Sequence, residues 1–530
     1  MSLLRVLSIF AACSGWVMSQ PVATFKIAGH VVRRADNRPA KRVRVSIAMV
    51  GQAGQQISCI TGDNGEFSFG GLPPAKYTLQ VNYHGWSQLF EQLDEFSTAI
   101  ATGPDLDSEH IVFPLDSPAR ITGSVLDEEG DPVPGVIVYL FERSLRGGLV
   151  QTRSNAQTNT GAEGEFHFTG LAPGIYYIAA TGHPWYAQNS PREIQGNQVD
   201  QGAPQSEPRS ELDLAYPLVY YDGGSTPEAA TPLKLEEGAT AEIHCTLRAV
   251  PALHIGVDGF QKQEGQALNL RISHIGPGGT LIFVTPGMDS GFGGIAPGSY
   301  VVSSSLLGEK QSSALGSQSV TLLADSTIHL SDAVPTSVKG KIILDGDMPP
   351  SMGVWMENLH NGNQAVALVN PDGTFDFSDV LPGRYALLLA NVTDLYMQSV
   401  KVKGGVYRNG ELPVPKGAEI QLTITAVKGV TKVNGKAVHG TKPVVGAMVL
   451  LLPNDPGHGN YIPRDQSDSD GTFTLNWALP GRYTLIAIDN GRGLAYADPA
   501  VIAPYLQGGR VLDLPLANDA TVQVEVQSRK

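Results

Sequence analysis

One short pattern occurs four times along the chain with nearly the same spacing. In each copy a glycine that follows Asp, Asn or Glu is followed by Phe two positions later and by Tyr twelve positions later. The four glycines are Gly65, Gly164, Gly373 and Gly471. A looser fifth copy begins at Gly291 and shortens the Phe-to-Tyr spacing from ten residues to eight. Repetition at a period near the size of a small domain predicts an array of modules, about five of ~100 residues each.

The repeated text also predicts the local structure of each copy. Asp-Gly and Asn-Gly pairs supply the positive φ angles of a hairpin turn, and the Phe that follows is expected to point into a core. A Pro-Gly or Pro-Pro pair before the Tyr adds a second turn, so the unit is predicted to be strand, turn, strand, turn, strand. The 60 glycines and 36 prolines, with only 17% charged residues, suit short strands joined by many turns. We therefore expect an all-β fold of tandem β-sandwich modules.

These patterns divide the chain into an N-terminal segment and five modules. The expected bounds are 1–20 for a signal peptide, then 21–117, 118–249, 250–333, 334–428 and 429–530 for the modules. The second module is expected to contain a polar surface loop from Gln188 to Arg209, and the third is degenerate. Only a few residues separate the last strand of one module from the first strand of the next, which favours a stiff, elongated string. Within the first module, apolar residues from Trp86 to Phe96 recur at helical spacing and indicate a short amphipathic helix or an irregular flap.

The N-terminal segment has the features of a secretory signal peptide. Arg5 precedes an apolar run over residues 7–18, and small residues near Ser19 offer a cleavage site. A frayed hydrophobic N-terminus is the alternative, and lipidation at Cys13 stays open. No later stretch reaches the ~18 apolar residues of a membrane helix, so no transmembrane segment is expected after signal removal. These features predict a secreted or cell-envelope protein, either extracellular or periplasmic.

Charge and motif content argue against several classes of function. The net charge of −14 is spread thinly without a Lys/Arg run, so nucleic acid is not an expected partner. No His is followed three residues later by Glu, and no G-x-S-x-G elbow or P-loop occurs. We therefore expect no enzyme, and neither a cofactor nor a metal. Cys59 and Cys245 fall in different modules and are expected to be buried free thiols.

One acidic turn resembles a calcium loop without completing it. Asp465, Asp468 and Asp470 precede Gly471, as alternating carboxylates do around a hard cation. Trp477, however, stands where such a loop places its twelfth-position Glu. An ordinary solvated turn is therefore the favoured interpretation.

The order of the motifs resembles a known family. The pattern x-G-x-V-x-D, P-V-x-G-x-x-V, D-x-x-G-x-F and L-P-P-G-x-Y is seen over residues 121–176 and, less completely, over 28–77 and 433–483. It resembles the carboxypeptidase regulatory-like domain, a family similar to transthyretin-like, collagen-adhesin B-type and starch-binding-like β-sandwiches. The resemblance implies a tandem array of about five immunoglobulin- or transthyretin-like sandwiches. It does not fix the function, because the same sandwich serves as a stabilising appendage, an adhesin stalk and a sugar binder.

The best candidate for a ligand site is a group of aromatic residues in the second module. Trp185 and Tyr186 follow Pro184, which is expected to end the preceding strand. Tyr220 and Tyr221 lie further along the same module. Sugar rings stack on exposed aromatic rings, although loop aromatics can also cap their own core. The sequence thus predicts an exported, non-catalytic binding protein, with polysaccharide as the first ligand to test and a cell-surface protein as the other partner. The alternative is a structural stalk or scaffold that presents a partner protein.

Overall fold

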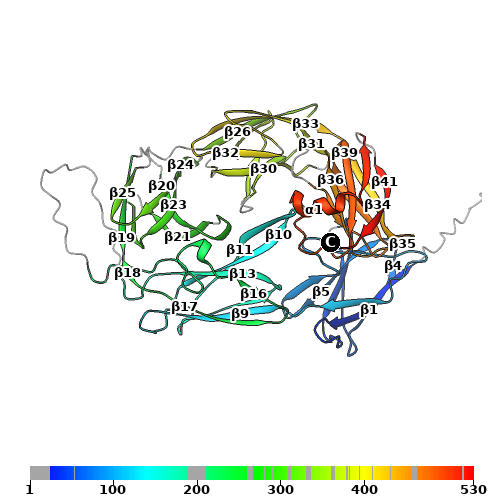
Figure 1. The fold of residues 1–530 in the computed structure, drawn as a ribbon, viewed down its shortest axis with the longest axis horizontal. Coiled ribbons are helices and arrows are strands. Elements are labelled where there is room, and N and C mark those ends of the chain that lie inside the picture. The colour runs from blue at the N-terminus through cyan, green and yellow to red at the C-terminus, as the bar shows by residue number, and fades with distance from the viewer. Residues whose placement is uncertain are drawn as a thin grey trace, which may run out of the picture.

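The structure is a computed structural model in which strands dominate (Figure 1). It describes residues 24–530 except for 53, 189–209, 260–266, 280, 288–290, 308–311, 330–335, 360–363, 378–379, 381, 393, 409, 430, 455–461 and 516–518. The expected signal peptide and the polar tract that follows Gln188 therefore lie outside the described residues.

The strands of the first two modules follow one another with short turns. Module one contains β1 (Phe25–Arg33), β2 (Arg44–Met49), β3 (Gln56–Ile60), β4 (Glu66–Leu72), β5 (Lys76–Tyr83), β6 (Trp86–Leu89), β7 (Ile100–Ala101) and β8 (Ile111–Leu115). Module two contains β9 (Ala119–Leu126), β10 (Ile137–Arg146), β11 (Leu149–Asn159), β12 (Glu165–Leu171), β13 (Gly174–Thr181), β14 (Leu214–Ala215), β15 (Val219–Tyr220), the 3-10 helix η1 (Pro227–Ala229), β16 (Leu233–Leu235) and β17 (Thr240–Thr246).

Modules three and four continue the same plan. Module three contains β18 (Val250–Pro251), β19 (Leu253–Asp258), β20 (Ala267–Ile275), the 3-10 helix η2 (Pro277–Gly279), β21 (Leu281–Gly287), β22 (Gly291–Ile295), β23 (Gly298–Leu307), β24 (Ser312–Leu322) and β25 (Ser326–His329). Module four contains β26 (Ser337–Leu344), β27 (Gly353–Asn358), β28 (Gln364–Leu368), β29 (Thr374–Phe377), β30 (Gly383–Ala390), β31 (Leu395–Lys403), β32 (Glu411–Val414) and β33 (Glu419–Lys428).

Module five adds a short helix to the plan. It contains β34 (Thr431–His439), β35 (Lys442–Pro443), β36 (Met448–Pro453), β37 (Arg464–Gln466), β38 (Thr472–Ala478), β39 (Gly481–Ile488), α1 (Pro499–Leu506), β40 (Arg510–Leu514) and β41 (Ala520–Gln527). Helix α1 begins where the Asp498 carboxylate accepts the N–H of Ala500 at 2.8 Å, with Pro499 in the first turn.

The five modules share one order of strands, and in module five parallel pairing of β41 with β39 joins the two sheets into one. In one sheet the first strand lies between an antiparallel partner and the last strand, which runs parallel to it: β4-β1-β8, β12-β9-β17, β22-β19-β25, β29-β26-β33 and β38-β34-β41. In the other sheet the second strand is central: β3-β2-β5, β11-β10-β13, β21-β20-β23, β28-β27-β30 and β37-β36-β39. The two sheets enclose a separate hydrophobic core in each module. The tandem β-sandwich fold is thus confirmed.

The repeated pattern forms the predicted turns. The turn glycines have positive φ angles, namely 73° for Gly65, 68° for Gly164, 85° for Gly373 and 78° for Gly471. The Phe two positions later is buried in every copy: Phe67, Phe166, Phe375 and Phe473. A side chain at such a glycine would be strained by the backbone angle. The prediction of a tight turn followed by a core Phe is therefore confirmed.

The Tyr of the pattern closes the second turn. Its ring is buried, and its hydroxyl donates to the carbonyl four residues earlier. The bonds are Tyr77 to Pro73 at 3.1 Å, Tyr176 to Ala172 at 2.8 Å and Tyr300 to Ala296 at 2.6 Å, and Tyr483 bonds Leu479 in the same way. In module four Tyr385 bonds the Asn358 side chain instead. The pattern thus keeps a buried hydroxyl satisfied inside a sandwich core.

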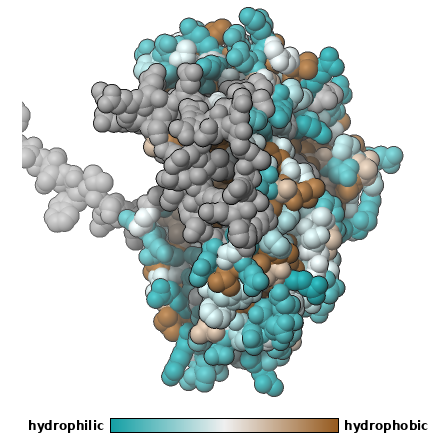
Figure 2. All heavy atoms as spheres, turned by 90° about the vertical axis from the view of Figure 1, so that its left-hand side faces the viewer, coloured by the Kyte–Doolittle hydropathy of each residue, from teal (hydrophilic) through white to brown (hydrophobic). Residues whose placement is uncertain are grey.

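The modules form a ring and not the elongated string that the short links suggested. Figure 1 shows module five lying beside module one, so the first and last modules of the chain meet. The contact is direct, since Ser469 of module five donates its N–H to the Ala99 carbonyl of module one at 2.9 Å. The short links remain, but the angles between successive modules bend the array back on itself. Figure 2 shows one side of this ring, where the described surface is mostly hydrophilic and apolar residues are scattered.

The structure also tests the predictions for residues 86–96 and for the two cysteines. Residues 86–96 form no helix, because β6 pairs with β5 and because Glu91 and Asp94 have φ angles of 45° and 55°. The flap interpretation of this segment is the correct one. Cys59 and Cys245 are free thiols, of which Cys245 is buried and Cys59 is half-buried.

Candidate binding sites

The structure separates the aromatic residues that the sequence placed in one site. Trp185 lies on the loop after β13, and 78% of its surface is exposed. The Tyr186 ring packs edge-on against it, with 5.5 Å between the ring centroids. Tyr220 is wholly buried in β15, beside Tyr139 and Phe141, so its ring is not available for stacking. Tyr221 is half-buried against the core of module two. The predicted platform is therefore reduced to Trp185 with Tyr186.

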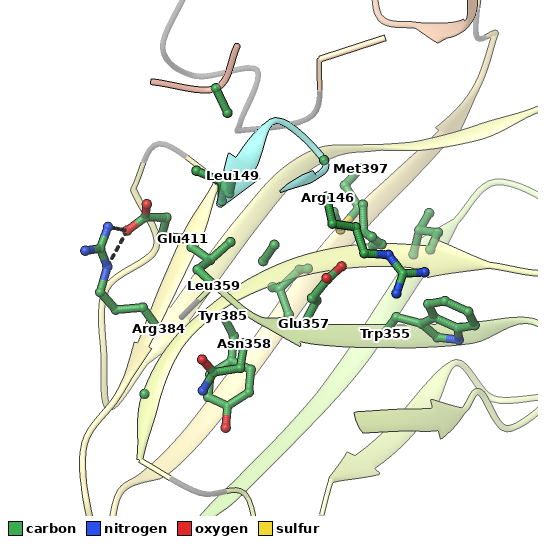
Figure 3. Close-up of a pocket in the computed structure, with 18 of the residues that line it drawn as sticks. Arg146, Leu149, Trp355, Glu357, Asn358, Leu359, Arg384, Tyr385, Met397 and Glu411 are labelled. Carbon is green, nitrogen blue, oxygen red and sulfur yellow. Dashed lines mark hydrogen bonds and ion pairs between the residues drawn. The ribbon is translucent and has the colours of Figure 1, made fainter. Parts of the chain in front are cut away.

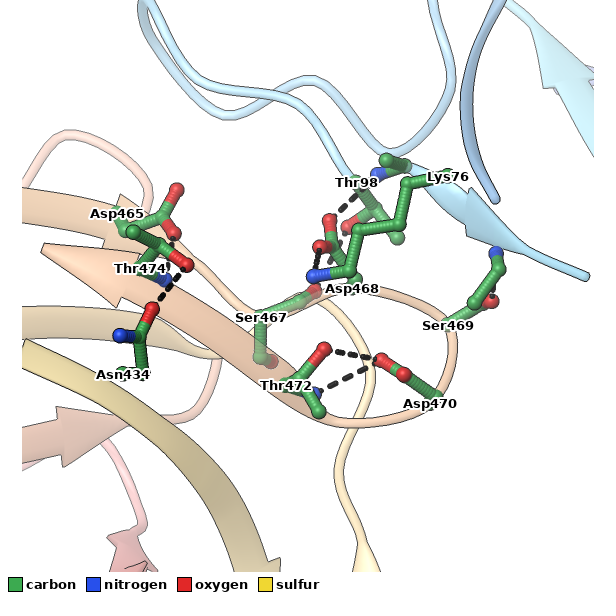
Figure 4. A network of polar contacts seen from close by, with 12 residues as sticks. Lys76, Thr98, Asn434, Asp465, Ser467, Asp468, Ser469, Asp470, Thr472 and Thr474 are labelled. Atoms are coloured by element: carbon green, nitrogen blue, oxygen red, sulfur yellow. Dashed lines mark hydrogen bonds and ion pairs between the residues drawn. The ribbon is translucent and has the colours of Figure 1, made fainter. Parts of the chain in front are cut away.

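The acidic turn of module five serves the contact with module one (Figure 4). Asp468 forms an ion pair with Lys76 and accepts the N–H of Ala99 at 2.9 Å. Asp470 instead accepts the N–H of Thr472 at 3.0 Å, within its own turn. The carboxylates thus face different partners, and no cluster of metal-ligating side chains occurs in the described residues. The turn is partly buried, so the expectation of a solvated turn is wrong for Asp468.

A buried ion pair forms the centre of this closure interface, by which we mean the contact between residues 91–102 and 464–470. Arg464, whose side chain is 3% exposed, donates from both terminal nitrogens to Asp94 at 3.2 Å. Its guanidinium lies 4.5 Å from the centre of the Phe96 ring and 5.3 Å from that of Tyr496. Such pairing and cation–π contact offset the cost of burying the charge. No sequence pattern joined these residues.

The hairpin of β10 and β11 braces the ring from inside. The Gly148 carbonyl at its tip accepts the N–H of Ala497 in module five at 3.1 Å. Arg146 pairs with Glu95 of module one at 2.7 Å, and Leu145 packs on the second apolar cluster of module five. Module two therefore contacts both sides of the closure interface.

Asp465 gives the closure region a dependence on pH. Burial raises its pKa from the ordinary 3.8 to about 6, although the N–H groups of Thr474 and Gln466 donate to its carboxylate. Because the folded state raises this pKa, the neutral carboxyl of Asp465 favours folding. Its contribution to the free energy of unfolding is fully present below pH ~4 and is lost as the pH rises through 6 and the carboxyl ionises.

The variant Asp465→Asn is expected to test this dependence. It keeps an accepting oxygen but cannot ionise, so its free energy of unfolding should rise relative to the wild type by roughly 1–2 kcal/mol between pH 4 and pH 7. Urea denaturation across that range measures the difference. Asp513→Asn, on the exposed strand β40, controls for the loss of a charge. Parallel pH profiles for wild type and Asp465→Asn would contradict the assignment.

The inside of the ring holds a cavity of about 1780 Å³ (Figure 3). All five modules contribute to its lining, for example through Phe96, Leu149, Val301, Trp355 and Tyr496. Ligand pockets usually measure about 300–1,000 Å³, so this space could hold an extended molecule. Its residues come from distant parts of the chain, and sequence reasoning found none of them as a site.

The repeated two-sheet modules define a modular β-sandwich protein. The family model of the carboxypeptidase regulatory-like domain matches residues 26–94 and 120–205, which lie in modules one and two. A search of curated proteins finds no match for the chain. Among the described residues, no helix combines the length and apolarity needed to cross a bilayer.

Solved structures with detectable similarity include bacterial pilins and a collagen-binding protein. The minor pilin GBS52 of Streptococcus agalactiae is 14% identical, with 43% of this chain and 96% of the pilin covered and a TM-score of 0.22. Two B repeat units of the collagen-binding protein of Staphylococcus aureus are 12% identical, with 94% and 99% covered and a TM-score of 0.15. TM-scores this low establish no common arrangement of modules, and no ligand follows from them.

Proposed function

We propose that the protein is an exported, non-catalytic scaffold of β-sandwich modules that binds carbohydrate outside the cell or in the cell envelope. The main support for carbohydrate as the ligand is that 78% of the surface of Trp185 is exposed. An exposed indole with a second aromatic ring beside it offers an apolar face on which the apolar face of a pyranose ring can stack. The loop-exposed Trp185 with Tyr186 beside it is the proposed stacking site.

Tyr186 supports this site by fixing one side of it. Its ring is half-buried, meets Trp185 at an interplanar angle of 90°, and lies within hydrogen-bonding reach of the buried Tyr216. A partner held in this way limits the movement of the indole. The cost of ordering Trp185 on binding is thereby reduced.

Replacing Trp185 with alanine is expected to abolish binding at this site. We expect polysaccharide affinity of the full-length protein to fall about tenfold or more, because the indole supplies most of the contact area. Calorimetry with soluble polysaccharides measures this. Leu323→Ala removes another strongly exposed apolar side chain, 77% exposed in module three, and should leave binding unchanged. Equal affinity in Trp185→Ala and wild type would remove the module-two site.

A scaffold that presents a partner protein is the second candidate. The closure interface favours it, because a buried ion pair between Asp94 and Arg464 fixes the two end modules relative to each other. A fixed ring holds the surfaces of its modules in constant relative positions. Absence of any carbohydrate binding, with the ring intact in solution, would favour this candidate.

A further inference from the structure

The outer face of one sheet in module four points into the central cavity. On β27, Val354 and Met356 point into the module core, so Trp355 and Glu357 point the other way. Trp355 pairs across the sheet with Val366 of β28 and Leu388 of β30. Figure 3 shows Trp355 and Glu357 projecting from this sheet into the cavity. The Trp355 indole therefore lies on the cavity side of this sheet, with apolar neighbours on both adjacent strands.

The charges around the cavity compensate one another. Each arginine in the lining forms an ion pair with a carboxylate. The pairs are Arg146 with Glu95 at 2.7 Å, Arg384 with Glu411 at 2.8 Å, and Arg464 with Asp94 at 3.2 Å. The other charged lining residues in the described chain, Glu357 and Lys416, have opposite signs. Across its described residues, the lining has no net positive field that would attract a polyanion. None of those residues is an unpaired arginine that would bind the carboxylate of a fatty acid. The lining therefore suits a neutral ligand.

One buried polar group in the lining lacks a partner. Gln151 on β11 is 4% exposed, and its Oε1 atom is buried without a hydrogen bond. Buried acceptors in folded proteins are nearly always satisfied, so the Gln151 oxygen needs a donor from the cavity, which a ligand hydroxyl can supply. Gln318 and Asn476 add further amides to the same lining. Hydroxyl groups are donors that such amides bind.

We propose that the central cavity is a second binding site, which takes a neutral oligosaccharide. Trp355 provides the stacking surface, and the Gln151 amide accepts a sugar hydroxyl. A neutral oligosaccharide matches each of these features. It is uncharged, and it has apolar ring faces and hydroxyl edges. A chain of several sugar units is long enough to extend through a space of about 1780 Å³. The site is separate from Trp185, which does not line the cavity. Its ligand class follows from its own lining.

Titration of the full-length protein with soluble hexasaccharides tests the proposal. The probes are the hexamers of glucose in α-1,4 and β-1,4 linkage, of xylose and of N-acetylglucosamine, with hexagalacturonate as the acidic comparison. We expect at least one neutral hexamer to bind and to change the tryptophan fluorescence. Trp355→Ala should weaken that binding about tenfold or more, and Trp355→Tyr should restore part of it, which separates stacking from misfolding. Gln151→Leu, similar in size, should weaken binding severalfold.

Leu323→Ala is the control, since it removes an exposed apolar side chain outside the cavity, and Trp185→Ala reports on the separate module-two site. If Trp185→Ala alone loses binding, the cavity proposal is overturned and the module-two site stands. If Trp355→Ala alone loses binding, the cavity site stands and the module-two site does not. The cavity proposal is also overturned if no neutral hexamer binds, if hexagalacturonate binds more tightly, or if Trp355→Ala keeps wild-type affinity while circular dichroism shows it folded.

Discussion

Replacing Arg464 with methionine is expected to open the ring. The methionine keeps much of the volume between Phe96 and Tyr496 but leaves the Asp94 carboxylate buried without its partner. Removing one member of a buried ion pair costs about 3–5 kcal/mol. That loss acts on the contact between modules one and five, which also contains the Lys76–Asp468 pair. Small-angle scattering should show a larger radius of gyration, and the thermal unfolding midpoint should fall.

A matched variant separates this effect from simple loss of charge. Arg482 and Asp513 form a pair at 3.9 Å whose side chains are 65% and 79% exposed. Exposed pairs contribute at most about 1 kcal/mol, so Arg482→Met should leave the scattering curve unchanged. The double variant Asp94→Asn/Arg464→Met should lose less than the sum of the single changes, because the two groups interact directly. A closed ring in Arg464→Met would show that the pair does not hold the modules together.

Replacing Gly471 with valine is expected to destabilise module five by about 2 kcal/mol or more. Gly471 has a φ angle of 78°, which a β-branched residue adopts only with strain. A Cβ there would also lie 2.7 Å from the Pro443 Cβ atom and 3.0 Å from the Ala437 carbonyl. Hydrogen exchange of the amides of β34 and β38 in the full chain reports the stability of this module.

Gly440→Val isolates the backbone part of that cost. Gly440 lies in the same module with a φ angle of 64°, but a Cβ there meets no atom within 4 Å. The two variants share the substitution and the strained angle, so the difference between them measures the clash. We expect Gly440→Val to cost about 1 kcal/mol. Equal exchange rates in Gly471→Val and wild type would refute the tight packing of this turn.

The structure within a module can be predicted from the sequence, whereas the contacts between modules cannot. The turn glycine, the Phe and the Tyr lie within twelve residues of one another, and each has a local physical reason for its identity. Asp-Gly pairs favour turns with positive φ at the glycine, and a buried Tyr needs an acceptor that the preceding turn supplies. Hence the sandwich fold could be predicted from one chain without a structure.

The closure interface and the cavity could not be predicted in this way. Arg464 and Asp94 are 370 residues apart, and their meeting depends on the angles at every junction between modules. Asp468 looked like a turn residue because its neighbours Asp470 and Gly471 are turn residues, yet its own carboxylate crosses to Lys76. The residues from Trp86 to Phe96 had helical spacing, but pairing of β6 with β5 outweighed that weak local preference.

The parallel pairing of first and last strands determines how a module responds to force. In module two, β9 and β17 lie side by side from Arg120–Thr240 to Leu126–Thr246. The chain enters the module at one end of this pair and leaves it at the opposite end. Tension between entry and exit pulls the two strands past each other, so their hydrogen bonds are loaded together, whereas an antiparallel hairpin pulled from its open end breaks its bonds one by one. Each module is therefore built to resist stretching by shear.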